Sequence, residues 1–204
     1  IAAGGEPEPA QMPVFRTVEP TVEPVTLAEV KLHIRQSASV GSLEDAMLTR
    51  WIKGARQRAE HLAQRALCTQ TWQQNLDGFP AAIELPWSPV QSVNFVKYRD
   101  ETNTLQTLDP ADYKVDIQGR STGYIVPAYG LAWPATYPEI NAVSVEWVAG
   151  YGDETAVPAC VVDWMLLIIE DRYSNRGANY SVNEELRPHP QLDRILDPIL
   201  NLRV

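Results

Sequence analysis

Two candidates for ligand binding or catalysis lie in residues 145–173, VEWVAGYGDETAVPACVVDWMLLIIEDRY. They are the glycines of its turn and the cysteine that follows them. Glycines before a helix can present backbone N–H groups to a phosphate, and a cysteine near a helix N-terminus can be activated as a nucleophile. The turn AGYGDE, however, carries Asp153 and Glu154, and it has neither the Lys-Ser/Thr of a P-loop nor a GxGxxG pattern. Apolar neighbours around Cys160 favour a buried thiol. We therefore interpret both features as structural.

The remaining candidates for catalysis or metal binding are scattered. His33, His61 and His189 are far apart in sequence, with no HExxH or other local ligand pair. Neighbouring acids such as those at 170–171 and 184–185 would point to different sides of a helix, which suits a cooperating acid/base pair poorly. We predict no catalytic residue, no metal ligand and no cofactor. An enzyme whose site is assembled from distant residues remains an alternative.

Composition limits the possible classes of protein. The 204 residues are 45% hydrophobic, enough for a globular core. With 17 Lys+Arg against 26 Asp+Glu the net charge is −9, so no basic surface for gripping nucleic acid is expected, and the six tryptophans are better explained by packing. Cys68 and Cys160 form no disulfide or zinc pattern, which fits a reducing cytoplasm. We expect neither a signal peptide at the start nor a membrane span.

Hydrophobic periodicity predicts two helices early in the chain. TLAE at 26–29 is a capping box that begins a short helix at about 27–36. Ser42 with Asp45 repeats the signal before a long helix at 43–67, which carries one apolar stripe. The other face of the long helix is expected to be solvated; its residues are Arg50, Lys53, Arg56, Arg58, Glu60 and Arg65.

The middle of the chain changes to a period of two. From Cys68 to Trp147, six short strand-like runs are separated by Gly, Pro and Asp-Asn turns, and RDETNT at 99–104 is typical of a hairpin tip. The chain then returns to helix at 158–173, where apolar residues occur on nearly every face, so this helix should be the covered central rod of a bundle. The predicted bundle core comprises Trp51, Ile52, Leu62, Trp164, Leu167 and Ile168.

The predicted fold class is α+β, a helical bundle with a β-rich subdomain inserted between the second and third main helices. The bundle takes residues 26–67 and 156–176, and the insertion takes residues 68–155. A proline-rich arm at 1–25 has too little apolar content to fold alone, so we expect a neighbouring subunit or ring to hold it. Residues 177–204 form a loop and a C-terminal helix, which Pro198 should kink or restart.

The order of these signals resembles a known family. PVTLAEVKLHIR, LTRWIKGARQRAEHLAQRAL, IELPWSPVQSVNFVKY, YKVD and VSVEWVAGYGDETAVP, followed by an apolar helix, resemble the head-tail connector (adaptor) family of tailed bacteriophages, prophages and gene transfer agents. The similarity spans about residues 24–175. The segment QSASVGSLED is less acidic than the family pattern, and the two termini fall outside the similarity.

The resemblance implies a non-enzymatic structural protein of the virion neck, present in the host cytoplasm during assembly. It implies a homo-oligomeric ring, of twelve copies, between the portal protein and a stopper or tail-terminator protein. DNA would pass through the lumen without specific binding, and an acidic lining would repel its phosphates. Another neck ring, either a stopper or a terminator, is the alternative within the same assembly.

The resemblance also implies that the C-terminal region engages the portal. Five apolar residues at helical spacing form a stripe there: Leu192, Ile195, Leu196, Ile199 and Leu200. A marginal helix interrupted by proline could not hide such a stripe by itself. The alternative is that the stripe packs back on its own bundle, as most terminal amphipathic helices do.

Overall fold

The computed structural model describes residues 14–35, 44–117, 122–175 and 194–200. Its helices and antiparallel sheets confirm the α+β class. The chain divides into two compact units, a β unit and a helical unit. The β unit takes Ile1–Glu19, Thr71–Leu85 and Val90–Val148, and the helical unit takes Pro20–Gln70, Pro86–Pro89 and Ala149–Val204.

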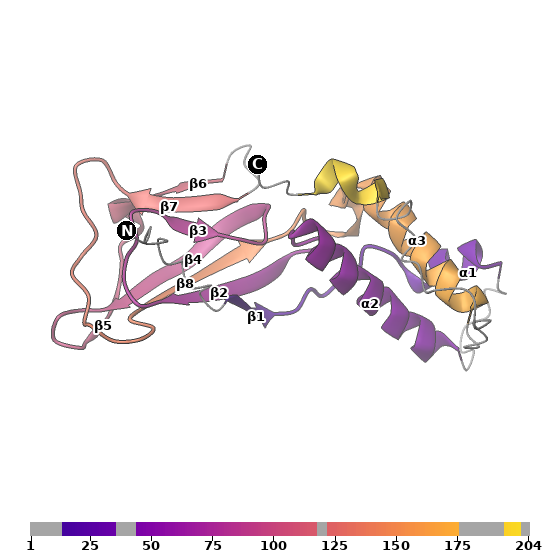
Figure 1. The fold of residues 1–204 in the computed structure, drawn as a ribbon, viewed down its shortest axis with the longest axis horizontal. Helices are drawn as coiled ribbons and strands as arrows, with labels where there is room; N and C mark the ends of the chain where they lie inside the picture. The colour runs from indigo at the N-terminus through magenta and orange to yellow at the C-terminus, as the bar shows by residue number, and fades with distance from the viewer. Residues whose placement is uncertain (1–13, 36–43, 118–121, 176–193, 201–204) are drawn as a thin grey trace, which may run out of the picture. The chain divides into compact units, whose positions relative to one another are not determined.

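The helical unit contains α1 (Leu27–His33), α2 (Asp45–Ala63), α3 (Ala159–Ser174) and two short 3-10 helices, η2 (Glu154–Ala156) and η3 (Arg194–Ile199) (Figure 1). α2 packs against α3, α1 contacts both, and η3 packs mainly on α3. Among the helices of the described segments, none is long and apolar enough to cross a membrane.

Local signals explain where these helices begin and end. The capping box of α1 is confirmed, because the Thr26 hydroxyl accepts from the Glu29 amide at 3.2 Å and the Glu29 carboxylate accepts from the Thr26 amide at 2.7 Å. α2 is preceded by Glu44, which makes no side-chain cap, and Ser42 of the predicted second box lies outside the described residues. α2 ends where Gln64 adopts a left-handed conformation with φ 52°, several residues before the predicted end at 67.

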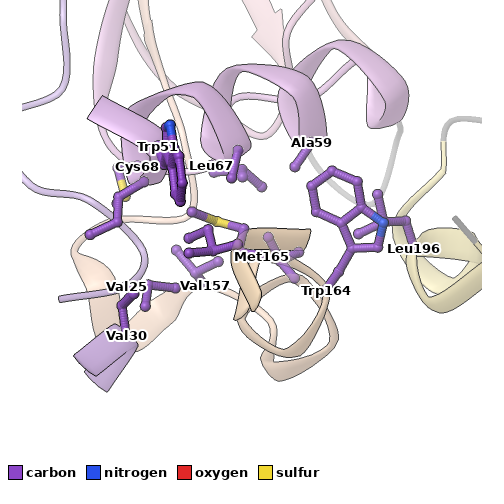
Figure 2. Close-up of a cluster of buried hydrophobic side chains, with 14 of the residues drawn as sticks. Val25, Val30, Trp51, Ala59, Leu67, Cys68, Val157, Trp164, Met165 and Leu196 are labelled. Atoms are coloured by element: carbon purple, nitrogen blue, oxygen red, sulfur yellow. The ribbon is translucent and has the colours of Figure 1, made fainter. Parts of the chain in front are cut away.

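The core of the helical unit is formed where these elements meet. Figure 2 shows the Trp164 ring of α3 between Ala59 of α2 and Leu196 of η3, with Met165 extending toward Trp51 and Leu67. Val25 and Val30 join the cluster from the segment around α1. The apolar side chains of α3 are therefore covered by α2, α1 and η3 on the face that holds Val161, Trp164, Met165 and Ile169.

The β unit holds two antiparallel sheets (Figure 1). One has five strands in the order β1-β2-β8-β4-β5, and the other has three in the order β3-β7-β6. The strands are β1 (Val14–Val18), β2 (Gln70–Leu76), β3 (Ile83–Leu85), β4 (Val90–Arg99), β5 (Leu105–Thr107), β6 (Tyr113–Asp116), β7 (Gly123–Pro127) and β8 (Val143–Ala149), with the 3-10 helix η1 (Pro110–Asp112) before β6. Buried and half-buried side chains alternate along β2 and β8, as in strands with one face on a core.

The hairpin tip predicted at 99–104 is confirmed, since it joins β4 to β5. The carboxylate of Asp100 accepts from the amides of Thr102 at 2.9 Å and Thr104 at 3.0 Å, so one side chain orders the turn. The hydrogen bonds from the Thr102 hydroxyl and the Gln106 side chain, and after them those from the two backbone amides, lower the pKa of Asp100 to about 2.

Part of the N-terminal arm has a different place from the predicted one. Val14–Val18 forms β1, an edge strand that pairs with β2 of the same chain, with Val14 opposite Gln74 and Val18 opposite Thr71. Composition predicted an arm with no partner in its own chain, but an edge strand needs only backbone hydrogen bonds to a neighbouring strand. Residues 1–13, the rest of the arm, lie outside the described residues.

Candidate interaction surfaces

The C-terminal segment forms the 3-10 helix η3 in place of an α-helix, and it packs on its own helical unit. Leu196 and Ile199 are buried in the core, while Ile195 and Leu200 are half-buried against it. The guanidinium of Arg65 donates to the Ile199 carbonyl at 2.7 Å. Leu192, the fifth residue of the predicted docking stripe, lies outside the described residues. The described part of the stripe is thus occupied within the chain, and it does not form an open apolar surface.

The predicted bundle core needs correction at three positions. Trp51, Ile52 and Trp164 are buried. Leu62 is 38% exposed, although Ala59 and Ala63 on either side of it in α2 are buried in the core, so Leu62 lies on a different face of the helix. Leu167 and Ile168 are half-buried; Ile168 packs against the core cluster, whereas Leu167 is not part of it. α3 is therefore covered on one face and partly covered elsewhere.

The face of α2 opposite the apolar stripe is not uniformly solvated, contrary to the sequence prediction. Arg56 and Glu60 are buried, 0% and 3% exposed. Arg56 forms ion pairs with Glu60 at 2.8 Å and with Glu23 at 2.7 Å. The second oxygen of Glu60 accepts from the Gln70 amide at 2.6 Å and from the Leu67 backbone at 3.2 Å. This polar network fixes the segments before α1 and after α2 against α2.

The turn AGYGDE is a structural junction, as the sequence predicted. Gly150 has φ 130°, and a Cβ there would lie 2.4 Å from the Cys68 carbonyl oxygen, so only glycine fits. The Gly150 and Tyr151 amides donate to Pro89 and Leu67 carbonyls, both at 2.9 Å. These amides are consequently not available to a phosphate. Asp153 accepts from Thr155 and Ala156, and these bonds lower its pKa.

The cysteines and histidines form no reactive arrangement in the described residues. Cys68 is buried, and desolvation raises its pKa to about 12, which removes the thiolate needed of a nucleophile. Cys160 is half-buried. His33 contacts Glu170 at 2.9 Å, and His189 lies outside the described residues. Across the described segments, no group of three or more His, Cys, Asp or Glu side chains could hold a metal ion.

A groove between α2 and α3 was not predicted from the sequence. It has a volume of about 190 Å³ and is lined by Trp51, Gly54, Ala55, Arg58, Ile168, Ile169, Asp171 and Arg172. The guanidinium of Arg172 lies 4.8 Å from the centre of the Trp51 ring, and that of Arg58 lies 5.9 Å from the centre of the Trp164 ring. Both arginines are thus held on tryptophan faces at its rim. The one signal in the sequence was Gly54, an unusual residue in the middle of a helix.

Comparison with known proteins finds similarity at the level of structure. No protein family matches the sequence, and no curated protein matches it. A chain from the neck of an empty gene transfer agent (GTA) particle, computed with C6 symmetry, superposes with a TM-score of 0.74 at 19% identity, over 95% of this chain and 97% of that chain.

Two further solved structures agree. A chain from the virion of a native gene transfer agent particle gives a TM-score of 0.74 at 18% identity, over 95% of this chain and 97% of that one. A chain from the neck of a native GTA particle computed with C12 symmetry gives 0.65 at 17% identity, over 92% and 97%. The present chain shares its fold, over nearly its whole length, with chains of GTA necks and virions.

Proposed function

We propose that this chain is a structural protein of a virion neck, specifically the head-tail connector (adaptor) that forms a ring between the portal and the tail-side neck proteins. The observation that carries the proposal is the match to a GTA neck chain over 95% of this chain and 97% of the other, because both units and the chain order between them are shared. The order of sequence signals resembles the same family. The proposal includes the bundle-with-insertion organisation that the resemblance implies.

A ring of twelve copies around the DNA channel is part of the proposal. Its support is that the neck structures with this fold were computed with C6 and C12 symmetry. The net charge of −9 suits a channel wall, since carboxylates repel the phosphates of passing DNA and prevent sticking. The proposed role needs no catalysis and no cofactor. A buried, protonated Cys68 and a turn whose amides are used internally are in keeping with such a role.

The test is to add the purified chain to DNA-filled heads that carry a portal but no neck proteins. We expect the chain to sediment with these heads, not with heads that lack a portal, and to appear as a ring directly beneath the portal in an electron-microscopic reconstruction. A ring found further down the neck would instead identify the chain as a stopper or terminator. Failure to bind in the presence of the other neck proteins would contradict a neck function altogether.

A further inference from the structure

The groove between α2 and α3 has the size of one large apolar side chain. Its volume is about 190 Å³, and a cavity of about 150 Å³ is known to hold a benzene molecule. Ile168, Ile169, Ala55 and the Trp51 ring supply apolar walls. A Cβ built on Gly54 meets no atom within 4 Å, so the groove is open at this point. An occupant can therefore approach close to the α2 backbone.

The rim of the groove is basic in a chain whose net charge is −9. Arg58 and Arg172 stand on either side of it, and exposed Arg50 and Lys53 extend the positive charge along α2. Asp171 is the one carboxylate among the lining residues. The stacking of both arginines on tryptophan rings limits their motion, so little side-chain entropy is lost when they meet an anion. The complementary partner is an apolar side chain flanked by carboxylates.

α1 of the same helical unit presents such a surface. Leu32 is 80% exposed, although its neighbours Val30 and Lys31 are buried and fix the helix in place. Glu29 lies one turn before Leu32 on the exposed side, and the carboxylate of Glu170 contacts His33, the residue after Leu32, at 2.9 Å. No residue of α1 lines the groove, so Leu32 does not fill the groove of its own chain.

We propose that two copies of this chain join by insertion of Leu32 of one copy into the α2–α3 groove of the next, with Glu29 and Glu170 facing the arginines of the rim. In this contact Arg35, three residues after Leu32 and exposed, would face Asp171 of the receiving copy. The two surfaces differ, so each copy gives one Leu32 and receives another, and such a head-to-tail contact closes into a ring when its rotation permits. The inference rests on the proposed ring function and names the surface that builds the ring.

Two single substitutions test the contact without disturbing the core. Gly54→Leu fills the groove from within, at a position with free space and in a helix that tolerates leucine better than glycine. Leu32→Asp removes the inserted side chain at an exposed position. We expect the full-length Leu32→Asp variant to melt like the wild type and the Gly54→Leu variant to melt at the same or a higher temperature. By sedimentation velocity, each should weaken self-association about 30-fold or more, as expected for a central interface residue.

The matched controls place the same changes elsewhere. Gln57→Leu adds a leucine to the exposed face of α2 outside the groove, and Leu105→Asp changes an exposed leucine of the β unit. Both controls should assemble like the wild type. If they weakened assembly as much as Gly54→Leu and Leu32→Asp, the specific contact would be refuted.

A mixing experiment tests the head-to-tail geometry. The Leu32→Asp variant keeps an intact groove, and the Gly54→Leu variant keeps an intact Leu32. A one-to-one mixture should therefore form heterodimers and no larger species, since the two free ends of each dimer are both disabled. The proposal would be overturned if the mixture stayed monomeric. It would also be overturned if the wild type remained monomeric at millimolar concentration, or if the two variants assembled normally.

The outcome separates this interface from the neck function. If the wild-type chain binds portal-bearing heads and both variants still form normal rings, the proposed interface is refuted and the proposed function stands. Rings that are sensitive to both substitutions but never bind heads would support the interface and contradict the function.

Discussion

At the scale of single residues, the side chains of α3 contribute unequally to stability despite their similar hydrophobicity. Met165 is fully buried, whereas Leu167 is half-buried and stands outside the core cluster. We expect Met165→Ala to lower the free energy of unfolding by about 2–5 kcal/mol, because a cavity is left in the core. Leu167→Ala should cost less than about 1.5 kcal/mol. Urea denaturation of the two variants measures the difference, and equal losses would mean that α3 is covered on all sides.

Two glycines of the helical unit should respond in opposite directions to the same substitution. Gly150→Ala places a Cβ 2.4 Å from the Cys68 carbonyl at φ 130°, so the backbone must shift and stability falls. Gly54→Ala adds a methyl group in open space within α2 and should raise stability by about 0.5–1 kcal/mol. Thermal melting of both variants shows whether each substitution raises or lowers the stability of the protein. A stabilising Gly150→Ala would contradict the close approach of the two chain segments.

At the scale of elements, the Arg56 network joins α2 to the segments that flank it. Removal of Arg56 would leave Glu60, which is 3% exposed, without its charged partner. We expect Arg56→Ala to cost about 3–5 kcal/mol, the usual range for breaking a buried ion pair from one side. The control is Lys53→Ala, an exposed change on the same helix that should stay within about 0.5 kcal/mol. Similar values for both variants, from denaturant unfolding, would exclude a buried network.

The start of α1 should depend on pH through Glu29. Hydrogen bonds from the Thr26 backbone and hydroxyl lower the pKa of this carboxyl group below its ordinary value. Its stabilising contribution is therefore present above the ordinary pKa of a glutamate and is lost as the pH falls through the lowered pKa. Amide exchange in α1 should accelerate in that acid window in the wild type. Glu29→Gln should exchange faster already at neutral pH and show no such window; an identical profile would argue against the cap.

At the scale of the whole molecule, the features predicted well are those set by nearby residues. The capping box at Thr26 and Glu29, the hairpin tip around Asp100 and the three main helices each depend on contacts within a few positions. β1 was missed because its partner strand lies more than 50 residues away and the pairing uses backbone atoms. The burial of Arg56 was missed for a similar reason, since the residues that cover it come from segments on both sides of α2.

The interaction surfaces were harder to predict than the elements. The apolar stripe at 192–200 has the same spacing whether it meets another protein or its own bundle, and only the tertiary structure shows Leu196 and Ile199 buried in the core. The α2–α3 groove is formed by residues more than 100 positions apart, such as Arg58 and Ile168. No local sequence pattern could therefore predict the groove.

The role of the C-terminal segment can be decided by separating folding from docking in the whole chain. Leu196 is 0% exposed and Ile199 is 6% exposed, so Leu196→Ala and Ile199→Ala should each lower the free energy of unfolding by about 2–5 kcal/mol. At a temperature where either variant is still fully folded, sedimentation with portal-bearing heads should be unchanged, because these side chains serve the core. A variant that folds normally yet no longer sediments with the heads would reverse this conclusion. It would mean that η3 leaves its own bundle and inserts its apolar side chains into the portal.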